Sequence, residues 1–416
     1  MLTFPHRIRT VKSLAWASSR YLSTTGASPA PGNVESYMWG KDNNGSIWKS
    51  SHPTPSTLVD VPAKVEPLDS KASTTPTRVF CGPTDTAVLF QDNTCYVSGL
   101  NKYGQLGLGN KQPIPSPMLL ELPKGNDAAA PTITHVSLGE KFAAFVADTG
   151  DLYTCGWNGS TLSGIGNLGL GDAEERLQPT LVESLVQDEC QVRQVVVGDA
   201  HMTVLTTEGE VLTVGSGAYG KLGNFDNTDQ LYLDPVELLN SGVAEIAGGH
   251  SFTLALKEDG VVYGWGRNDK GQLGTGLGLS VDMYAVQTVP EPIDTDELSN
   301  RKVTKIAAGH SHAAAITESG EFFHWGMSNH LEPVRVNELV HTKIVDVCCG
   351  EDYTLALDCD GRLYSFGQGK SGTLGQGSVR HLTEATFMEI FQDRRVAQFS
   401  AGWKHAACLL EAIPQD

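Results

Sequence analysis

The chain has 416 residues, with 45 glycines and 20 prolines, and its 48 acidic against 30 basic residues give a formal net charge of −18. So many glycines and prolines exclude long helices and favour short strands joined by tight turns. The acidic balance disfavours direct nucleic-acid binding, which requires a basic face, and no apolar stretch approaches the ~18 residues of a membrane span.

Residues 1–34 have a composition of their own. They contain no Asp or Glu, several serines, and apolar residues at loosely helical spacing among four basic residues, Arg7, Arg9, Lys12 and Arg20. Such an acid-free amphipathic segment is typical of an import peptide, and the stretch that follows Arg20 is similar to a matrix-processing site. We therefore predict a mitochondrial import presequence and linker over residues 1–34 and a location in the mitochondrial matrix. The alternatives are a disordered tail, a plastid peptide, or a protein of the cytoplasm or nucleus.

Short hydrophobic runs that end in Gly recur seven times in the chain that follows. Their final glycines are Gly40, Gly99, Gly156, Gly215, Gly266, Gly326 and Gly367. Successive glycines of this set lie between 41 and 60 residues apart. A period of this size indicates an array of small supersecondary units that bury their apolar faces against one another. We therefore predict a structural role for these seven glycines, which we call the landmark glycines.

Each unit has two halves. The first is a β-branched run that ends in Gly and continues into a small apolar strand, as in residues 246–256. The second is a turn such as Asp259-Gly260, followed by another strand that ends at the landmark glycine. Because Gly accepts the positive φ of primed turns, X-Gly between apolar runs predicts a β-hairpin. A glycine-rich loop, such as Gly99–Gly109 or Gly266–Gly274, follows the second half.

This repeat resembles that of the regulator of chromosome condensation family, over nearly all of the chain after the predicted presequence. The resemblance implies an all-β fold, a seven-bladed β-propeller with four-stranded blades. We accordingly predict one domain over residues 35–412 and a short tail at 413–416. Val396–His405 is a first half with no second half after it, and Tyr37–Gly40 is a second half with no first half before it. We expect these C- and N-terminal halves to pair as one blade and close the ring, which removes free sheet edges.

Several apparent active-site motifs belong to the repeat. Gly215–Gly220 and Gly367–Gly372 match GxGxxG, but a dinucleotide site needs these glycines to open a helix in a βαβ unit. His201, His312 and His405 fall at the fourth position of a Gly-x-x-His step that holds an aromatic residue in other copies, which predicts a packing position. The eight cysteines include no CxxC pair. We therefore expect no metal site, no cofactor and no catalytic residue.

Polar residues just past the glycine of the first half are the candidate partner-binding residues. They are Glu140, Asp199, His250, His310, Glu351 and Asp352. The chain turns there at one rim of the predicted propeller, and loops on rigid scaffolds commonly carry function. The alternative is an ordinary solvated loop. Two irregular loops, Trp157–Asp172 and the acidic insertion Leu277–Asn300, are further candidates for a binding face, with neutral loop drift as the alternative.

The founding member of the family uses the same loop to engage the small GTPase Ran and promote nucleotide release, so the resemblance implies a regulator of GTPases. Gly198–His201 matches the acidic form of that loop, whereas the next copy, Gly249–Phe252, supplies no second acid. We therefore predict a non-catalytic protein-interaction scaffold or regulator that acts through one propeller face in the mitochondrion. Its expected partners are proteins, either a small GTPase or assembly factors of an organellar ribosome or complex, and we expect a monomer. The alternative is a guanine-nucleotide exchange factor that uses acidic residues of the rim loops.

Overall fold

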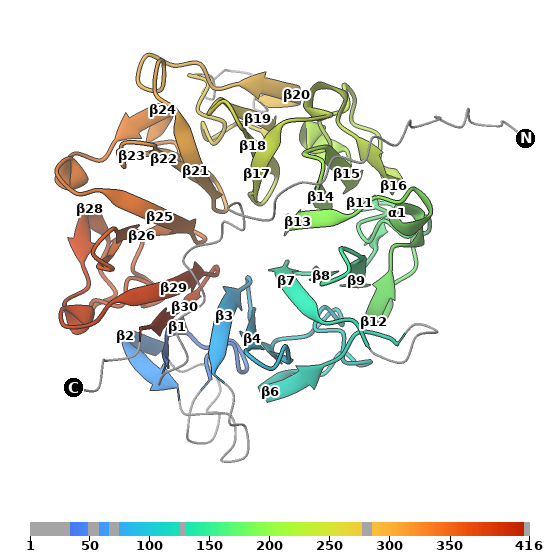
Figure 1. Cartoon of the computed structure of the whole chain (residues 1–416), viewed down its shortest axis with the longest axis horizontal. Helices are drawn as coiled ribbons and strands as arrows, with labels where there is room; N and C mark the ends of the chain where they lie inside the picture. The colour runs from blue at the N-terminus through green and yellow to red at the C-terminus, as the bar shows by residue number, and fades with distance from the viewer. Residues whose placement is uncertain (1–33, 49–57, 66–74, 125–129, 277–284, 412–416) are drawn as a thin grey trace, which may run out of the picture.

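The computed structural model describes residues 34–48, 58–65, 75–124, 130–276 and 285–411. These residues form seven four-stranded antiparallel sheets, arranged as blades around a common axis (Figure 1). In each blade one edge strand lies nearest the axis and the opposite edge strand lies at the outer rim. The chain is therefore an all-β, seven-bladed propeller, as predicted.

We number the blades in the order in which the chain completes them, so blade 1 is the first blade formed by one continuous segment. The strands of each blade are given from the axis outwards. Blade 1 comprises β3 (Pro76–Cys81), β4 (Asp85–Phe90), β5 (Cys95–Gly99) and β6 (Ile114–Leu120). Blade 2 comprises β7 (Ile133–Leu138), β8 (Phe142–Ala147), β9 (Leu152–Gly156) and β12 (Arg176–Leu181). Blade 3 comprises β13 (Val192–Val197), β14 (His201–Thr206), β15 (Val211–Gly215) and β16 (Gln230–Pro235).

The next three blades follow the same order. Blade 4 comprises β17 (Val243–Gly248), β18 (Phe252–Lys257), β19 (Val262–Arg267) and β20 (Val286–Pro292). Blade 5 comprises β21 (Val303–Ala308), β22 (His312–Thr317), β23 (Phe322–Gly326) and β24 (His330–Arg335). Blade 6 comprises β25 (Ile344–Cys349), β26 (Tyr353–Asp358), β27 (Leu363–Gly367) and β28 (Leu382–Phe387).

Blade 7 is built from both ends of the chain. It comprises β29 (Val396–Ala401), β30 (His405–Leu410), β1 (Glu35–Lys41) and β2 (Leu58–Val65). β1 pairs with β30 from Glu35 opposite Leu410 to Gly40 opposite His405. An ion pair of 2.7 Å between Arg394 Nη1 and Glu35 Oε2 adds to this junction. The predicted closure of the ring by the two terminal halves is therefore confirmed.

The remaining elements are short connections. They are the hairpin β10 (Gly159–Ser160) and β11 (Gly164–Ile165), the helix α1 (Glu183–Gln187), and the 3-10 turns η1 (Ala218–Gly220), η2 (Glu237–Leu239), η3 (Asn337–Leu339) and η4 (Glu389–Phe391). The helix and three of the 3-10 turns join the outer strand of one blade to the inner strand of the next. The sequence pattern did not predict them.

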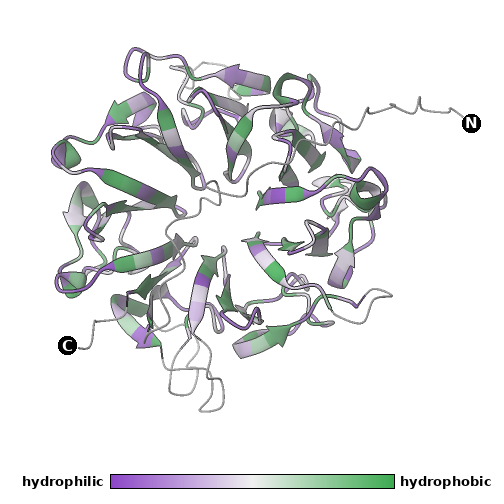
Figure 2. Ribbon diagram, viewed as in Figure 1, coloured by the Kyte–Doolittle hydropathy of each residue, from purple (hydrophilic) through white to green (hydrophobic). Residues whose placement is uncertain are grey.

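The hydrophobic core is divided among the seams between blades. Figure 2 shows hydrophobic residues spread over the strands of all blades rather than gathered at one centre. Val97 of blade 1 and Phe145 of blade 2, for example, are both fully buried in one cluster that spans the two sheets. Each blade therefore buries its two apolar faces against its two neighbours, as expected for a repeat architecture.

Each landmark glycine is the last or second-last residue of the third strand of its blade and faces the first residue of the second strand. The seven pairs are Gly40–His405, Gly99–Asp85, Gly156–Phe142, Gly215–His201, Gly266–Phe252, Gly326–His312 and Gly367–Tyr353. All seven glycines have a φ between 100° and 134°. At Gly266 an added Cβ would lie only 2.7 Å from the carbonyl oxygen of Ser251. Left-handed backbone and close strand contact together require glycine here.

Replacing Gly266 with Ala tests the contact between the strands. Gly242 provides a matched control, because its φ of 69° is also left-handed but an added Cβ would meet no atom within 4 Å. We expect Gly242→Ala to cost about 1–2 kcal/mol of folding free energy from backbone strain alone, and Gly266→Ala to cost more because the clash adds to the strain. Chemical denaturation of both variants measures the difference. Equal losses would contradict the argument.

Hydrogen bonds that run between sheets hold the blades in a ring. The third residue of every inner strand is polar, and the seven residues are Arg78, His135, Gln194, Glu245, Lys305, Asp346 and Gln398. Gln194 exchanges two bonds of 2.8 and 3.1 Å with the backbone of Ile246 in the next blade. Gln398 does the same with Val79 across the seam between blades 7 and 1, at 2.9 and 3.0 Å. These side chains therefore act as latches between neighbouring inner strands.

Indole rings form a second set of latches farther from the axis. Trp39, Trp265 and Trp325 each precede a landmark glycine and are buried. Their Nε1 atoms donate to backbone carbonyls in the glycine-rich loop of the preceding blade, at distances of 2.7 to 3.0 Å. Each of these three loops carries Gly-x-Leu-Gly, as do the loops of blades 1 and 2, where the next copy has Cys155 or Val214 in place of the tryptophan.

Candidate functional site

Strand direction brings the predicted site residues to one end of the propeller. Because neighbouring strands of a blade are antiparallel, the loop after the first strand and the glycine-rich loop after the third strand lie at the same end. We call this end the mouth. A cavity of about 270 Å³ lies on the axis there, and the ends of all seven inner strands line it. Glu140, His250 and His310 are among its lining residues.

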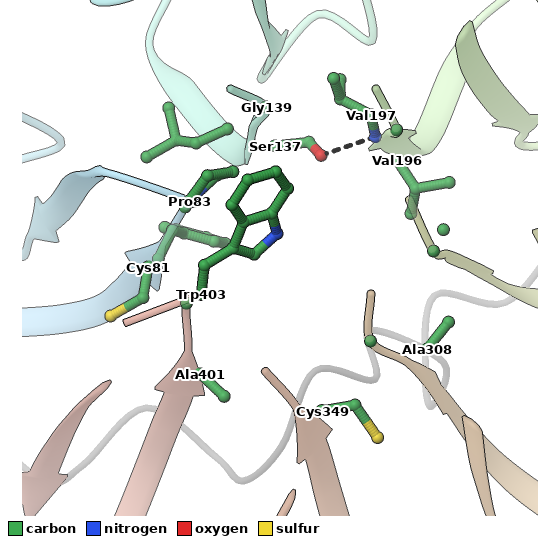
Figure 3. A pocket seen from close by; sticks show the side chains of 18 of the residues that line it. Cys81, Pro83, Ser137, Gly139, Val196, Val197, Ala308, Cys349, Ala401 and Trp403 are labelled. Carbon is green, nitrogen blue, oxygen red and sulfur yellow. Dashed lines mark hydrogen bonds between the residues drawn. The ribbon is translucent and has the colours of Figure 1, made fainter. Parts of the chain in front are cut away.

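Three aromatic rings meet at the centre of the mouth. Trp403, from the loop after β29, projects into the cavity (Figure 3). His250 and His310 are stacked with ring centroids 4.3 Å apart and planes 14° apart. Each of these imidazoles lies edge-on to the indole of Trp403, at 5.7 and 5.6 Å. An aromatic cluster from blades 4, 5 and 7 therefore lines the cavity at the mouth.

Asp199 is held in an ion pair beside this cluster. Its Oδ1 atom lies 2.7 Å from Nζ of Lys141, and its Oδ2 atom lies 4.0 Å from Nε2 of His250. Burial alone would raise the pKa of Asp199, but the hydrogen bond from Lys141 and the neighbouring positive charges hold it below its ordinary value. Lys141 also lies over the ring of Trp157, at 5.2 Å. Asp199 is thus a charged and paired carboxylate rather than a free one.

The other predicted acids also gather at the mouth. Burial raises the pKa of Glu351, and the charge of Lys404 opposes this while those of Asp352 and Glu140 add to it. Glu140 belongs to blade 2 and Glu351 to blade 6, so carboxylates from nearly opposite sides of the ring come close enough to influence one another. All six predicted partner-binding residues therefore lie at the same end of the propeller.

Lys141, Lys221 and Trp403 are mouth residues that the sequence pattern did not single out. Lys221 occupies the second position of a Gly-Lys-Leu-Gly loop, where sister loops have Gln, Asn or Thr, and only 3% of it is exposed. Burial lowers the pKa of Lys221 to about 8, and the charge of Asp199 opposes this. The sequence could have indicated Lys221 as a mouth residue, because it is charged where the sister loops have neutral residues.

The imidazoles of the mouth are unsuited to proton transfer near neutral pH. Burial lowers the pKa of His250 to about 4, with the neighbouring His310 adding to the effect. Both rings are therefore neutral at pH 7, and their stacking carries no charge repulsion. The part of the chain that the structure describes contains no group of three or more His, Cys, Asp or Glu placed to hold a metal ion.

The histidines of the Gly-x-x-His step are packing residues, as predicted. His201, His312 and His405 are buried, and each Nε2 atom meets the hydroxyl of a threonine in the next blade. The distances are 3.3, 3.1 and 2.8 Å. Burial lowers the pKa of His201 to about 3 and those of the other two to about 4. In blade 1 the same position holds Asp85, whose pKa burial raises to about 7.

The first irregular loop contains a projecting hairpin. β10 and β11 pair within Trp157–Asp172, and the exposed fraction of Leu162 at the tip is 98%. The base of the hairpin is tied to blade 3 by a bond of 3.1 Å from the Ile165 nitrogen to Asp229 Oδ2. The extra length of this loop is therefore an ordered element beside the mouth.

The second irregular loop is only partly described. Residues 277–284 of the predicted insertion Leu277–Asn300 lie outside the described residues. The remainder contributes β20 and a turn that lines a cavity at the end opposite the mouth. No helix among the described residues is long and apolar enough to cross a membrane.

Comparison with protein-family models identifies the repeat. The model described as Regulator of chromosome condensation (RCC1) repeat matches residues 92–146, 149–205, 208–256, 259–316 and 360–409. A second model with the same description matches residues 243–272, 303–330 and 344–373.

Among curated proteins, the chain is 34% identical over 250 residues to the Ultraviolet-B receptor of Arabidopsis thaliana, covering 60% of this chain and 52% of the receptor. It is 34% identical over 240 residues to the Secretion-regulating guanine nucleotide exchange factor of Bos taurus, covering 56% of this chain and 48% of the exchange factor. The chain thus spans about half the length of these relatives. Among solved structures, Prp20p from Saccharomyces cerevisiae superposes with a TM-score of 0.79 at 18% identity, covering 94% of each chain. That likeness concerns the fold alone.

Proposed function

Because this chain belongs to the regulator of chromosome condensation repeat family, we propose that it is a non-catalytic regulator that binds a protein partner through the mouth of its propeller. One observation carries the proposal: loops from every blade converge on this end and bring four acidic residues to the same rim as an aromatic cluster of His250, His310 and Trp403. Polar groups of both charges around aromatic rings are typical of protein-binding surfaces. The latches between blades hold these loops on a rigid base, as a binding surface requires.

The relatives support a protein-binding regulator. One is named a guanine nucleotide exchange factor, another is named a homolog of a GTPase regulator, and the structure of Prp20p is described with its binding to Gsp1p and histones. For the present chain, a small GTPase or an assembly factor of an organellar complex is the proposed partner.

Charge reversal of Lys141 tests whether the mouth binds the partner protein. Lys257 is a matched control, because it also lies over an aromatic ring, that of Tyr263 at 5.6 Å, but at the opposite end of its blade. Lys141→Glu breaks the ion pair with Asp199 and places two carboxylates together. We expect proteins recovered with the tagged chain to fall at least tenfold for Lys141→Glu and to stay unchanged for Lys257→Glu, measured by quantitative mass spectrometry. Equal recovery with both variants would contradict a partner site at the mouth.

Guanine-nucleotide exchange is the second candidate, and the hairpin of β10 and β11 favours it. A leucine that is 98% exposed at the tip of an ordered hairpin can insert between the elements of a partner that hold its nucleotide. Asp199 is engaged by Lys141, so the hairpin is better placed than the rim acid to act as the wedge.

Release of fluorescent GDP from a panel of organellar GTPases tests this candidate. For an exchange factor we expect faster release from at least one GTPase, and a loss of at least tenfold in the exchange rate for Leu162→Ser. Asp199→Ala measures the contribution of the rim acid. Ile390→Ser is the control, because Ile390 is also exposed but lies in η4, at the other end of the propeller. No acceleration for any GTPase rejects exchange and leaves partner binding as the function.

A mitochondrial location is part of the proposal and is supported by the composition of residues 1–34. Residues 1–33 lie outside the described residues. We expect a fluorescent reporter fused after residue 34 to enter mitochondria, and the same fusion with its four basic residues changed to Gln to remain outside, as measured by microscopy and protease protection. A wild-type fusion that stays in the cytosol would contradict the proposed location.

A further inference from the structure

One glycine-rich loop has a phenylalanine where its sister loops have glycine. Four loops place a glycine with left-handed φ two residues after Gly-x-Leu-Gly, and these glycines are Gly109, Gly171, Gly276 and Gly377, with φ between 67° and 80°. Blade 3 has Phe225 at this position, with a φ of 73°. The Phe225 nitrogen donates to the Thr288 oxygen of the next blade at 3.1 Å, as the four glycines donate to outer strands at 2.8 to 3.0 Å. The backbone hydrogen bond at Phe225 is therefore the same as in the sister loops, and only the side chain differs.

The Phe225 side chain is unfavourable for the isolated fold. A bulky residue with left-handed φ is a strained conformation that glycine avoids. Burial of the ring could compensate for the strain, but 60% of Phe225 is exposed. Large aromatic side chains that stay exposed on a rigid loop are typical anchors of protein interfaces. Strain in an exposed aromatic residue therefore points to a contact outside this chain.

The surroundings of Phe225 are acidic. No Lys or Arg occurs between Leu222 and Leu256, whereas five acidic residues do, namely Asp226, Asp229, Asp234, Glu237 and Glu245. Glu245 is buried and paired with Lys305. Asp226, Asp229 and Asp234 are exposed, as is Tyr232 on the outermost strand β16, at 55%. We define the blade 3 rim as Phe225, Asp226, Asp229, Tyr232 and Asp234.

We propose that the blade 3 rim docks a basic, amphipathic segment of a partner protein. An apolar side chain of that segment covers the ring of Phe225, and its Lys or Arg residues pair with Asp226 and Asp234. The three aspartates of the rim favour a basic partner over nucleic acid and anionic lipid. This surface is at the outer edge of blade 3, separate from the axial aromatic cluster, and the inference does not depend on the function proposed for the mouth.

The test uses the full chain and two fluorescein-labelled synthetic peptides. One is a 16-residue amphipathic peptide of Leu and Lys, and the other has Glu in place of Lys. In fluorescence polarisation we expect the Leu/Lys peptide to bind and the Leu/Glu peptide not to bind. We expect Phe225→Gly to weaken binding at least fivefold and Ile390→Ala to leave it unchanged, because Ile390 is exposed but lies in η4, between blades 6 and 7. Asp226→Asn with Asp234→Asn should weaken binding and reduce its dependence on salt.

Thermal denaturation of Phe225→Gly separates a binding role from a structural one. Glycine relieves the left-handed strain, so we expect a melting temperature equal to or above that of the wild type. A lowered melting temperature would mean that the ring supports the fold and would overturn the proposal. Peptide binding that Phe225→Gly leaves intact, or equal binding of the Leu/Glu peptide, would also overturn it.

Discussion

The seam between neighbouring blades is the constraint on which the rest of this structure depends. A four-stranded sheet satisfies its own backbone groups along its inner pairs, but an innermost strand has one edge without a partner strand. In this protein a polar side chain at the third position of the inner strand bonds to the inner strand of the next blade, as Gln194 and Gln398 do with identical geometry. Buried backbone groups that lost these partners would cost about 1–3 kcal/mol each. Chemically different residues fill the position around the ring, so the requirement is for a bond and not for one residue type.

Closure gives the mouth its rigidity. Blade 7 joins the two ends of the chain through β1 and β30, and the latch of Gln398 then ties this blade to blade 1. Because the ring is closed in this way, the loops at the mouth are free to vary without loss of the ring. That division explains why the repeat residues are structural, while the residue just past the Gly of the first half varies and brings Trp403, His250 and His310 together on the axis.

Two surfaces with different character emerge from the same scaffold. The mouth combines paired charges such as Lys141 and Asp199 with neutral aromatic rings, which suits a partner of mixed polarity. The blade 3 rim combines an exposed phenylalanine with unbalanced negative charge, which suits a basic partner. A ring of seven similar units presents many loops, and function enters where a unit departs from the common pattern.

The repeat, the landmark glycines and the closure by two terminal halves could be predicted from the amino-acid sequence, and the four-stranded units followed from the family resemblance. These depend on local geometry, since a left-handed φ and a close strand contact require glycine in any copy, and Gly266 illustrates both. The sequence also placed the six polar loop residues at one rim, because strand alternation fixes the end at which each loop lies. The stacking of His250 on His310 beside Trp403 and the ion pair between Lys141 and Asp199 are visible only in the folded chain. Those contacts join side chains that are 58 or more residues apart, and their distances follow from the diameter of the ring, which no local pattern encodes.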